Sequence, residues 1–226
     1  MASFSDFSNI LPDPVHKIGT VGQTDVTGST GPGFSSIKLS SIDSLMSDKT
    51  NSKRINTRAV SYHKWEIDIS YNPMTREEFD PVYTFLMHRR TILKPFYVEL
   101  PQYVGQSSSA TVVNGEFLKG VDKLIVTNPN PDTVPPMILK IGTGSKVYSI
   151  TRVESTTSYN NILPTLLADE ERFHITPGLV HNVTNNEALD FITPWFYVQE
   201  VGDTLSYTID DKNLYKFSLK LEEVNI

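Results

Sequence analysis

The sequence of 226 residues contains no cysteine. This absence excludes a disulfide-stapled scaffold, a thiolate metal site and a cysteine nucleophile, and it leaves the redox compartment open. No stretch approaches the roughly 18 apolar residues that a membrane-spanning helix needs, so we expect no membrane partner. The first seven residues lack a basic segment followed by an apolar run, so we expect no signal peptide.

Positive charge is also scarce. The chain has 20 Lys and Arg against 26 Asp and Glu, which gives a formal net charge of −6 at pH 7. Proteins that wrap duplex DNA are usually basic, so this balance argues against specific nucleic-acid binding. Aromatic residues are plentiful at 10%, which favours strands, and 38% hydrophobic with 20% charged residues is typical of a soluble domain. The length allows one large domain or two smaller ones.

A strand and a helix are predicted in the first half of the chain. Apolar and polar side chains alternate over residues 65–71, which predicts a strand with one buried face. Thr75 and Glu78 have the spacing of a capping box. Because proline cannot sit deep in a helix, we place the main helix from Pro81 to residues 94–95, after a short turn. Helical spacing predicts the buried stripe Phe79, Val82, Tyr83 and Leu86.

Residues 102–194 differ from the segments that flank them. They contain short apolar runs separated by clusters of Pro, Gly and Asn, which is typical of a small barrel or sandwich. Residues 142–145 are predicted to turn a hairpin. The predicted strands of this region cover residues 124–126, 137–141, 147–150 and 173–175. After Pro194 the outer pattern resumes and ends in a strand in which Phe217, Leu219 and Leu221 alternate with polar residues.

We therefore predict a mainly β protein with one flanking α-helix. Residues 34–101 and 195–226 form one discontinuous domain, and residues 102–194 form a second β domain inserted into it. Residues 1–33 are predicted to be a flexible N-terminal arm, because the part after residue 20 is almost all Gly, Thr, Ser, Val, Asp and Pro without a period. Docking of this arm on a neighbour stays open, through the scattered apolar residues Phe4, Phe7, Ile10 and Leu11. Residues 40–54 are predicted to be a long polar loop available for assembly.

The sequence offers no catalytic site. It has neither a Gly-x-Ser-x-Gly nucleophile elbow nor a P-loop. His174 and His181 bracket a Pro-Gly turn but have no obvious third metal ligand. The acidic runs at 169–171, 210–211 and 222–223 are predicted to be solvated, because adjacent carboxylates rarely face one sugar bond. We predict no enzyme activity, no cofactor, and no catalytic, cofactor-binding or metal-binding residue.

Four segments resemble the distal tail proteins of long-tailed bacteriophages, especially the type with an inserted barrel. Each is mainly a hydrophobic pattern, and their order and spacing carry the resemblance, which spans most of the chain from Gly33. Residues 1–32, residues 104–122 and the Pro-rich loop at 129–136 lie outside it. The segments are GFSSIKL at 33–39 with WEIDISY at 65–71; EF at 78–79 with YTFL at 83–86 and FYVELPQY at 96–103; ILKI at 138–141 with KVYSIT at 146–151; and YKFSLKLEE at 215–223.

The resemblance implies a structural virion protein that forms a ring, a hexamer in this family, at the distal end of a phage tail. The discontinuous domain would share the tail-tube fold, a β-sandwich or barrel with one helix, and the insert would be an OB-like barrel. The implied partners are further copies of the chain, the tail tube protein and the tail-tip hub or baseplate proteins, with tail fibres as a further option. DNA would pass through the lumen without specific binding. The implied location is the virion tail, after assembly in the host cytoplasm.

Two alternatives stay open. The chain could be an equivalent ring in the baseplate of a contractile tail. It could also be a carbohydrate-binding or fibre-mounting adaptor that acts through the OB-like insert, since OB folds often bind oligosaccharides. The carbohydrate version predicts exposed aromatic side chains in the insert, such as Tyr148 or Phe173, on one concave face.

Overall fold

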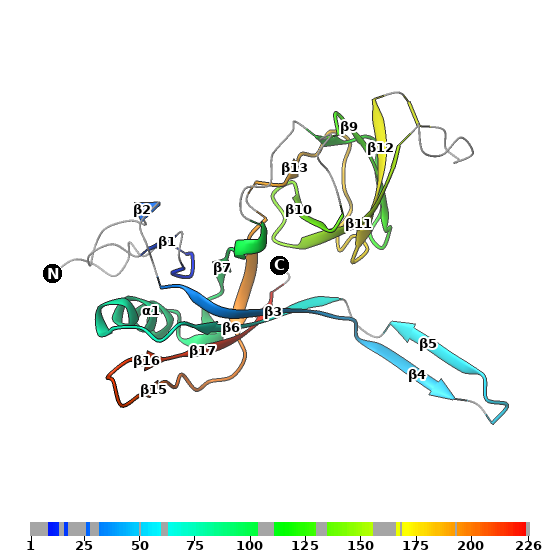
Figure 1. Cartoon of the computed structure of the whole chain (residues 1–226). Helices are drawn as coiled ribbons and strands as arrows, with labels where there is room; N and C mark the ends of the chain where they lie inside the picture. The colour runs from blue at the N-terminus through cyan, green and yellow to red at the C-terminus, as the bar shows by residue number, and fades with distance from the viewer. Residues whose placement is uncertain are drawn as a thin grey trace. The chain divides into compact units, whose positions relative to one another are not determined.

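The structure, a computed structural model, places most of the chain in two compact units. The first consists of Met1–Val98 and Tyr197–Val224, and the second is built on Glu99–Phe196. Within the described residues the chain is mainly β with one α-helix, which confirms the predicted fold class (Figure 1). The described residues are 9–13, 16–17, 26–27, 32–49, 51–59, 63–103, 111–129, 135–155, 166–167, 169–192 and 194–224.

The first unit is built on a five-stranded sheet. Its strand order is β3-β6-β17-β14-β7. Along β6, buried residues alternate with half-buried ones, as the sequence predicts. Ile67 lies opposite Leu221 of β17, and Ile69 lies opposite Leu219, so the apolar side chains of neighbouring strands share one face. The strands are β3 (Phe34–Ile42), β6 (Lys64–Tyr71), β7 (Phe96–Val98), β14 (Phe196–Glu200) and β17 (Ser218–Glu223).

The helix α1 (Arg76–Arg89) begins one turn earlier than predicted. The expectation of a start at Pro81 is wrong because the capping box starts the helix. The Glu78 carboxylate accepts hydrogen bonds from the Thr75 N–H at 2.9 Å and from the Thr75 hydroxyl at 3.0 Å. Pro81 then lies in the second turn, where it removes a single backbone hydrogen bond.

The helix also ends earlier than the predicted stop at residues 94–95. Arg90 adopts the left-handed conformation, with φ of 51°, and its N–H donates to the Met87 carbonyl at 3.2 Å. A short 3-10 helix, η2 (Thr91–Leu93), follows. The left-handed residue therefore stops the helix before the proline can do so.

Most of the predicted buried stripe of α1 is confirmed. Phe79, Val82 and Leu86 are buried, together with Phe85. Tyr83 is only half-buried and stacks on Phe79, with ring centroids 5.1 Å apart. The helix thus buries its apolar side chains in the core of the first unit, where the Phe85 ring meets Phe96 of β7 edge-on, with ring centroids 5.3 Å apart.

Replacing Leu86 by alanine should lower the free energy of unfolding by about 2–5 kcal/mol, because the side chain is wholly buried. The neighbouring Met87 is 58% exposed, so Met87→Ala is a matched control with an expected change below about 0.5 kcal/mol. Urea unfolding followed by circular dichroism measures both variants. Equally small changes in the free energy of unfolding for Leu86→Ala and Met87→Ala would show that the helix buries a different face.

Residues 9–13 run beside the edge strand β7 and correct the expectation of a flexible arm at 1–33. The Leu11 N–H donates to the Tyr97 carbonyl at 2.9 Å, and the Tyr97 N–H donates to the Asn9 carbonyl at 2.7 Å. Leu11 is wholly buried, and the Tyr71 hydroxyl donates to a carbonyl of this segment at 2.9 Å. This part of the predicted arm therefore belongs to the core of the first unit. A single buried leucine in a non-periodic stretch leaves no pattern from which burial could be predicted.

Phe4 and Phe7 lie outside the described residues. Further along the predicted arm, β1 (His16–Lys17) and β2 (Val26–Thr27) pair in antiparallel fashion.

The second unit is a nearly closed barrel. The sheet order is β13-β10-β11-β12-β9-β8, and backbone hydrogen bonds join its two outer strands. The Val113 N–H donates to the Glu187 carbonyl at 2.9 Å, and the Leu189 N–H donates to the Thr111 carbonyl at 3.1 Å. The four predicted strands are confirmed: residues 137–141 coincide with one strand, and the other three predictions lie within longer strands. The strands are β8 (Val112–Val113), β9 (Lys123–Thr127), β10 (Met137–Ile141), β11 (Val147–Ser155), β12 (Glu170–Thr176) and β13 (Leu189–Asp190).

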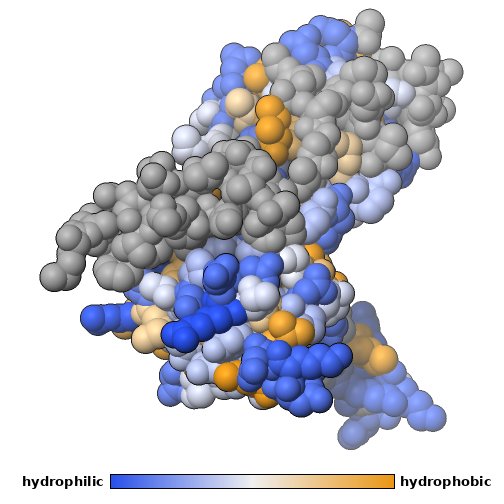
Figure 2. Space-filling model, turned by 60° about the vertical axis from the view of Figure 1, so that its left-hand side comes forward, coloured by the Kyte–Doolittle hydropathy of each residue, from blue (hydrophilic) through white to orange (hydrophobic). Residues whose placement is uncertain are grey.

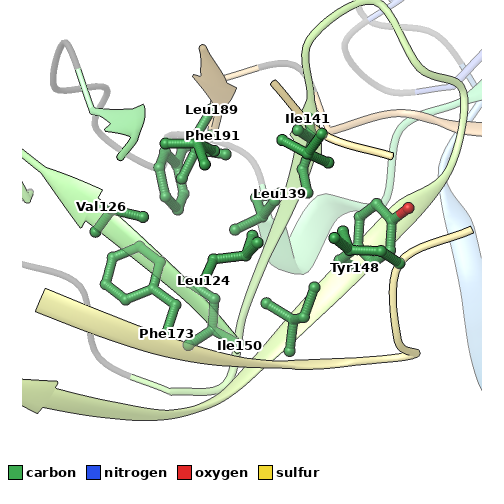
Figure 3. Close-up of a cluster of buried hydrophobic side chains, with 13 residues drawn as sticks. Leu124, Val126, Leu139, Ile141, Tyr148, Ile150, Phe173, Leu189 and Phe191 are labelled. Atoms are coloured by element: carbon green, nitrogen blue, oxygen red, sulfur yellow. The ribbon is translucent and has the colours of Figure 1, made fainter. Parts of the chain in front are cut away.

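The barrel interior is filled with apolar side chains, including Leu124, Leu139 and Phe173 (Figure 3). Tyr148 and Phe173 are both wholly buried in this core. The expectation that either is exposed on a concave face is therefore wrong, because strand alternation directs both into the barrel. The predicted turn at 142–145 is confirmed, with β10 and β11 antiparallel and Gly142 at a φ of 55°.

Among the described residues, no helix is both long and apolar enough to cross a membrane.

Candidate interaction surfaces

The prediction of a polar loop at 40–54 is wrong: its first residues end β3, and the described residues from 45 onward belong to a β-hairpin. Strands β4 (Leu45–Lys49) and β5 (Ile55–Ala59) pair with each other in antiparallel fashion, and we call residues 45–59 the projecting hairpin. In Figure 1 it extends beyond the end of β3, away from the five-stranded sheet of the same unit. Residues 45–49 and 51–58 are all exposed, so both faces of the hairpin meet solvent.

The projecting hairpin exposes three large apolar side chains. Leu45 is 64% exposed, Met46 is 54% exposed and Ile55 is 64% exposed. An isolated two-stranded hairpin is marginally stable in water, and its unpaired edges invite further pairing. These features indicate a hairpin that is completed by contact with another surface.

The base of the projecting hairpin is held by a side-chain contact. Ser41, near the end of β3, has its Oγ 2.8 Å from Nε2 of His63, which precedes β6. The His63 ring is buried and packs edge-on against Trp65 at 4.7 Å. This contact joins β3 to the residue that precedes β6, so it links the chain segments on either side of the hairpin.

The five-stranded sheet has one edge, at β3, that no described strand covers. At the other edge, β7 is partly covered by residues 9–11 through backbone hydrogen bonds. On the opposite side, β3 pairs along its whole length with β6 and is the end strand of the sheet. A nine-residue edge strand of this kind is a ready template for a strand from another chain.

The face of the sheet opposite the core carries alternating charges. Lys64 Nζ lies 2.7 Å from Glu222 Oε2 and 3.4 Å from Glu66 Oε1. The hydrogen bond between Lys64 and Glu222 raises the pKa of Lys64 and lowers the pKa of Glu222. Two longer ion pairs extend the pattern: Lys220 with Glu66 at 3.9 Å and Lys38 with Asp68 at 3.8 Å. Three lysines thus face three carboxylates, so this polar face has no excess of either charge.

A second charged cluster lies on the barrel and joins β11 to β12. The Glu154 carboxylate lies 2.9 Å from His174 Nε2, 3.0 Å from Arg152 and 3.2 Å from Arg172. Burial alone would raise the pKa of Glu154, but the hydrogen bond to His174 and the neighbouring positive charges outweigh it and lower that pKa. A carboxylate held by three partners in this way is suited to joining strands rather than to proton transfer.

The structure does not bring His174 and His181 together with a third ligand. His174 contacts Glu154 instead. Within the described ranges, no three His, Asp or Glu side chains are placed to hold a metal ion.

Glu200 is a buried carboxyl group at the end of β14. It lies on the core face, is 5% exposed, and its Oε2 has no hydrogen-bond partner among the described residues. Burial raises the pKa of Glu200 from 4.5 to about 7.

The free energy of unfolding should fall as the pH rises from 4.5 to about 7, because folded Glu200 binds its proton more tightly than the unfolded residue does. Glu200→Gln removes this ionisation and should stabilise the chain by about 1–3 kcal/mol at pH 8, with little change at acidic pH. Urea unfolding of both proteins at the two pH values measures the effect. The same pH dependence of unfolding in the unmodified chain and in Glu200→Gln would contradict the raised pKa of Glu200.

Sequence reasoning found some of these surfaces and missed others. Alternation over residues 65–71 and 217–221 predicted which side chains lie on the polar face. It missed the projecting hairpin, because a strand exposed on both faces shows no alternation of apolar and polar residues.

In the view of Figure 2 the surface is mainly hydrophilic, with apolar side chains in small separate patches.

The comparison with known families covers the N-terminal part of the first unit. Residues 21–103 match the family model described as the distal tail protein pb9, A domain, N-terminal. The match supports the resemblance to phage distal tail proteins and a structural role in a virion tail. No curated protein sequence matches the chain.

Proposed function

We propose that the chain is a ring-forming structural protein at the distal end of a phage tail, where it joins the tail tube to the tail tip or baseplate. The observation that carries the proposal is the projecting hairpin, which exposes apolar side chains and lies within the matched residues 21–103. A cyclic ring places two different surfaces of neighbouring copies against each other. The hairpin is one of these surfaces, and the open edge of β3 offers backbone groups beside it.

The second surface is an apolar patch at the end of the helix. Met87 is 58% exposed, Ile92 is 48% exposed and Leu93 is 67% exposed, and we call these three residues the helix-end patch. It belongs to the same unit as the hairpin but to different elements, as a heterologous contact requires. In the proposed ring, the hairpin of one copy packs on the helix-end patch of the next.

Cysteine cross-linking tests this arrangement cleanly, because the chain has no cysteine of its own. The double variant Met46→Cys with Leu93→Cys should form, on mild oxidation, covalent oligomers up to a closed species. A control variant, Met46→Cys with Leu118→Cys, places the second thiol at a 69% exposed position of the barrel and should stay monomeric. Monomers in both cases would contradict the proposed contact.

The polar face of the sheet is the surface that we assign to the channel. Its lysines and carboxylates are equal in number and paired, so it would neither grip nor strongly repel DNA. The net charge of −6 agrees with a channel that passes DNA without binding it.

We also propose that residues 102–194 are an insert, an OB-like barrel that mounts further tail components, within the domain formed by 34–101 and 195–226. The chain leaves the first unit after Val98 and returns at Tyr197, on the neighbouring strands β7 and β14. Closely spaced ends are what an inserted domain requires.

Excising residues 102–194 and joining the ends through a short Gly/Ser linker should leave a folded remainder. Circular dichroism measures whether the remainder keeps its secondary structure and whether it unfolds in one cooperative thermal transition. An insoluble or molten remainder would show that the two units do not fold separately.

A further inference from the structure

The first unit contains a pocket of about 420 Å³ whose lining includes no residue of the projecting hairpin or of the helix-end patch. It lies at the end of the five-stranded sheet. Its lining serines come from β3 (Ser35), β6 (Ser70) and β17 (Ser218). Ser206 lies just before β15 (Thr208–Ile209), and Thr208 belongs to β15 itself. Its volume lies within the usual range of small-molecule sites.

The polar lining of this pocket is made of hydroxyl groups. Each hydroxyl can donate one hydrogen bond and accept two. Ser35 already donates to the Ser70 carbonyl at 3.1 Å, which leaves its lone pairs as acceptors. The one charged group of the lining, Lys216, has its Nζ 3.7 Å from Asp210 Oδ2. A free anion would therefore compete with Asp210 for the Lys216 ammonium group. A neutral hydroxylated ligand would instead find several hydroxyl groups with which to form hydrogen bonds.

Tyr207 adds an aromatic wall to the pocket. It is 43% exposed, and its ring centroid lies 4.9 Å from Phe79 and 5.4 Å from Tyr83. These contacts hold the ring in place, so a ligand that packs on it need not immobilise a free side chain. A held aromatic face beside hydroxyl groups matches a sugar, which presents C–H groups on one face and hydroxyls at its rim.

We propose that this pocket binds a neutral carbohydrate, with Tyr207 packing on the sugar ring and the Ser and Thr hydroxyls pairing with its hydroxyl groups. The pocket is complete within one chain, so binding does not depend on ring formation. The site is distinct from the barrel, in which Tyr148 and Phe173 are buried.

Saturation-transfer NMR tests the proposal on the full chain, with glucose, N-acetylglucosamine and maltose as probes and inorganic phosphate as the anionic comparison. We expect transfer to at least one sugar, with a dissociation constant of about 1 mM. Tyr207→Ala should weaken binding at least about tenfold, and Ser206→Ala should weaken it by a smaller factor. Ile209→Ala is the matched control, because Ile209 is 50% exposed, lies two residues away and is not part of the lining.

Three results would overturn the proposal. The first is no transfer to any of the three sugars. The second is transfer that Tyr207→Ala and Ser206→Ala leave unchanged while thermal melting shows both variants folded. The third is a shift of the pocket's backbone resonances with protein concentration and not with sugar, which would assign the pocket to a second copy of the chain. Failure of the ring alone would leave sugar binding intact.

Discussion

Replacing Leu45, Met46 and Ile55 of the projecting hairpin by serine should convert the assembled chain into a monomer without lowering its melting temperature. All three side chains are more than half exposed in the single chain, so the folded monomer loses little when they are shortened. In the proposed ring they are covered, and burying a large apolar side chain stabilises a contact by about 1.5–3 kcal/mol. A loss of about 4 kcal/mol at each contact weakens association about a thousandfold. Sedimentation velocity at several concentrations measures the change.

The barrel offers a matched control for the hairpin variant. Leu118, Leu167 and Ile192 are 69%, 63% and 52% exposed, so their triple replacement by serine removes similar apolar surface from the other unit. This control should assemble like the unmodified chain. The hairpin would not be the ring contact if the hairpin variant assembled like the unmodified chain. The same would follow if the control variant lost assembly to the same extent as the hairpin variant.

Deleting residues 2–30 should destabilise the first unit by about 5 kcal/mol or more. The deletion removes the wholly buried Leu11, two backbone hydrogen bonds to Tyr97, and the carbonyl that accepts the Tyr71 hydroxyl. Losing the leucine side chain alone costs about 2–5 kcal/mol, and each hydrogen bond adds about 1 kcal/mol. The sum approaches the whole stability of a typical domain.

Urea unfolding of the deletion variant measures this loss, and Leu11→Ala in the full chain provides the comparison. The point variant should lose about 2–5 kcal/mol and the deletion more. An unchanged transition in the deletion variant would restore the sequence-based expectation that residues 1–33 are a flexible arm.

Much of the fold could be predicted because its strands bury one face. Strand β6 shows this most clearly, since its buried Trp65, Ile67 and Ile69 alternate with polar residues. The helix was predicted from its stripe, but its start was misplaced, because the favourable capping box at Thr75 and Glu78 outweighs the cost of Pro81 in the second turn.

The projecting hairpin and the burial of Leu11 and Tyr148 were harder to predict, for two physical reasons. The projecting hairpin is exposed on both faces, so its residues carry no signal of alternation. Leu11 is buried through its contacts with the distant strand β7, and no local pattern reports such a contact. The inward orientation of Tyr148 likewise depends on which face of its strand becomes the barrel interior, which is decided by pairing with distant strands.

Electron microscopy of the purified full chain tests the central claim most directly. The account predicts closed rings, hexameric by the family resemblance, with an open channel lined by the polar face that carries Lys64, Glu66 and Glu222. In these rings the projecting hairpin of each copy lies on its neighbour. Monomers at every concentration, or open filaments without a channel, would contradict the account.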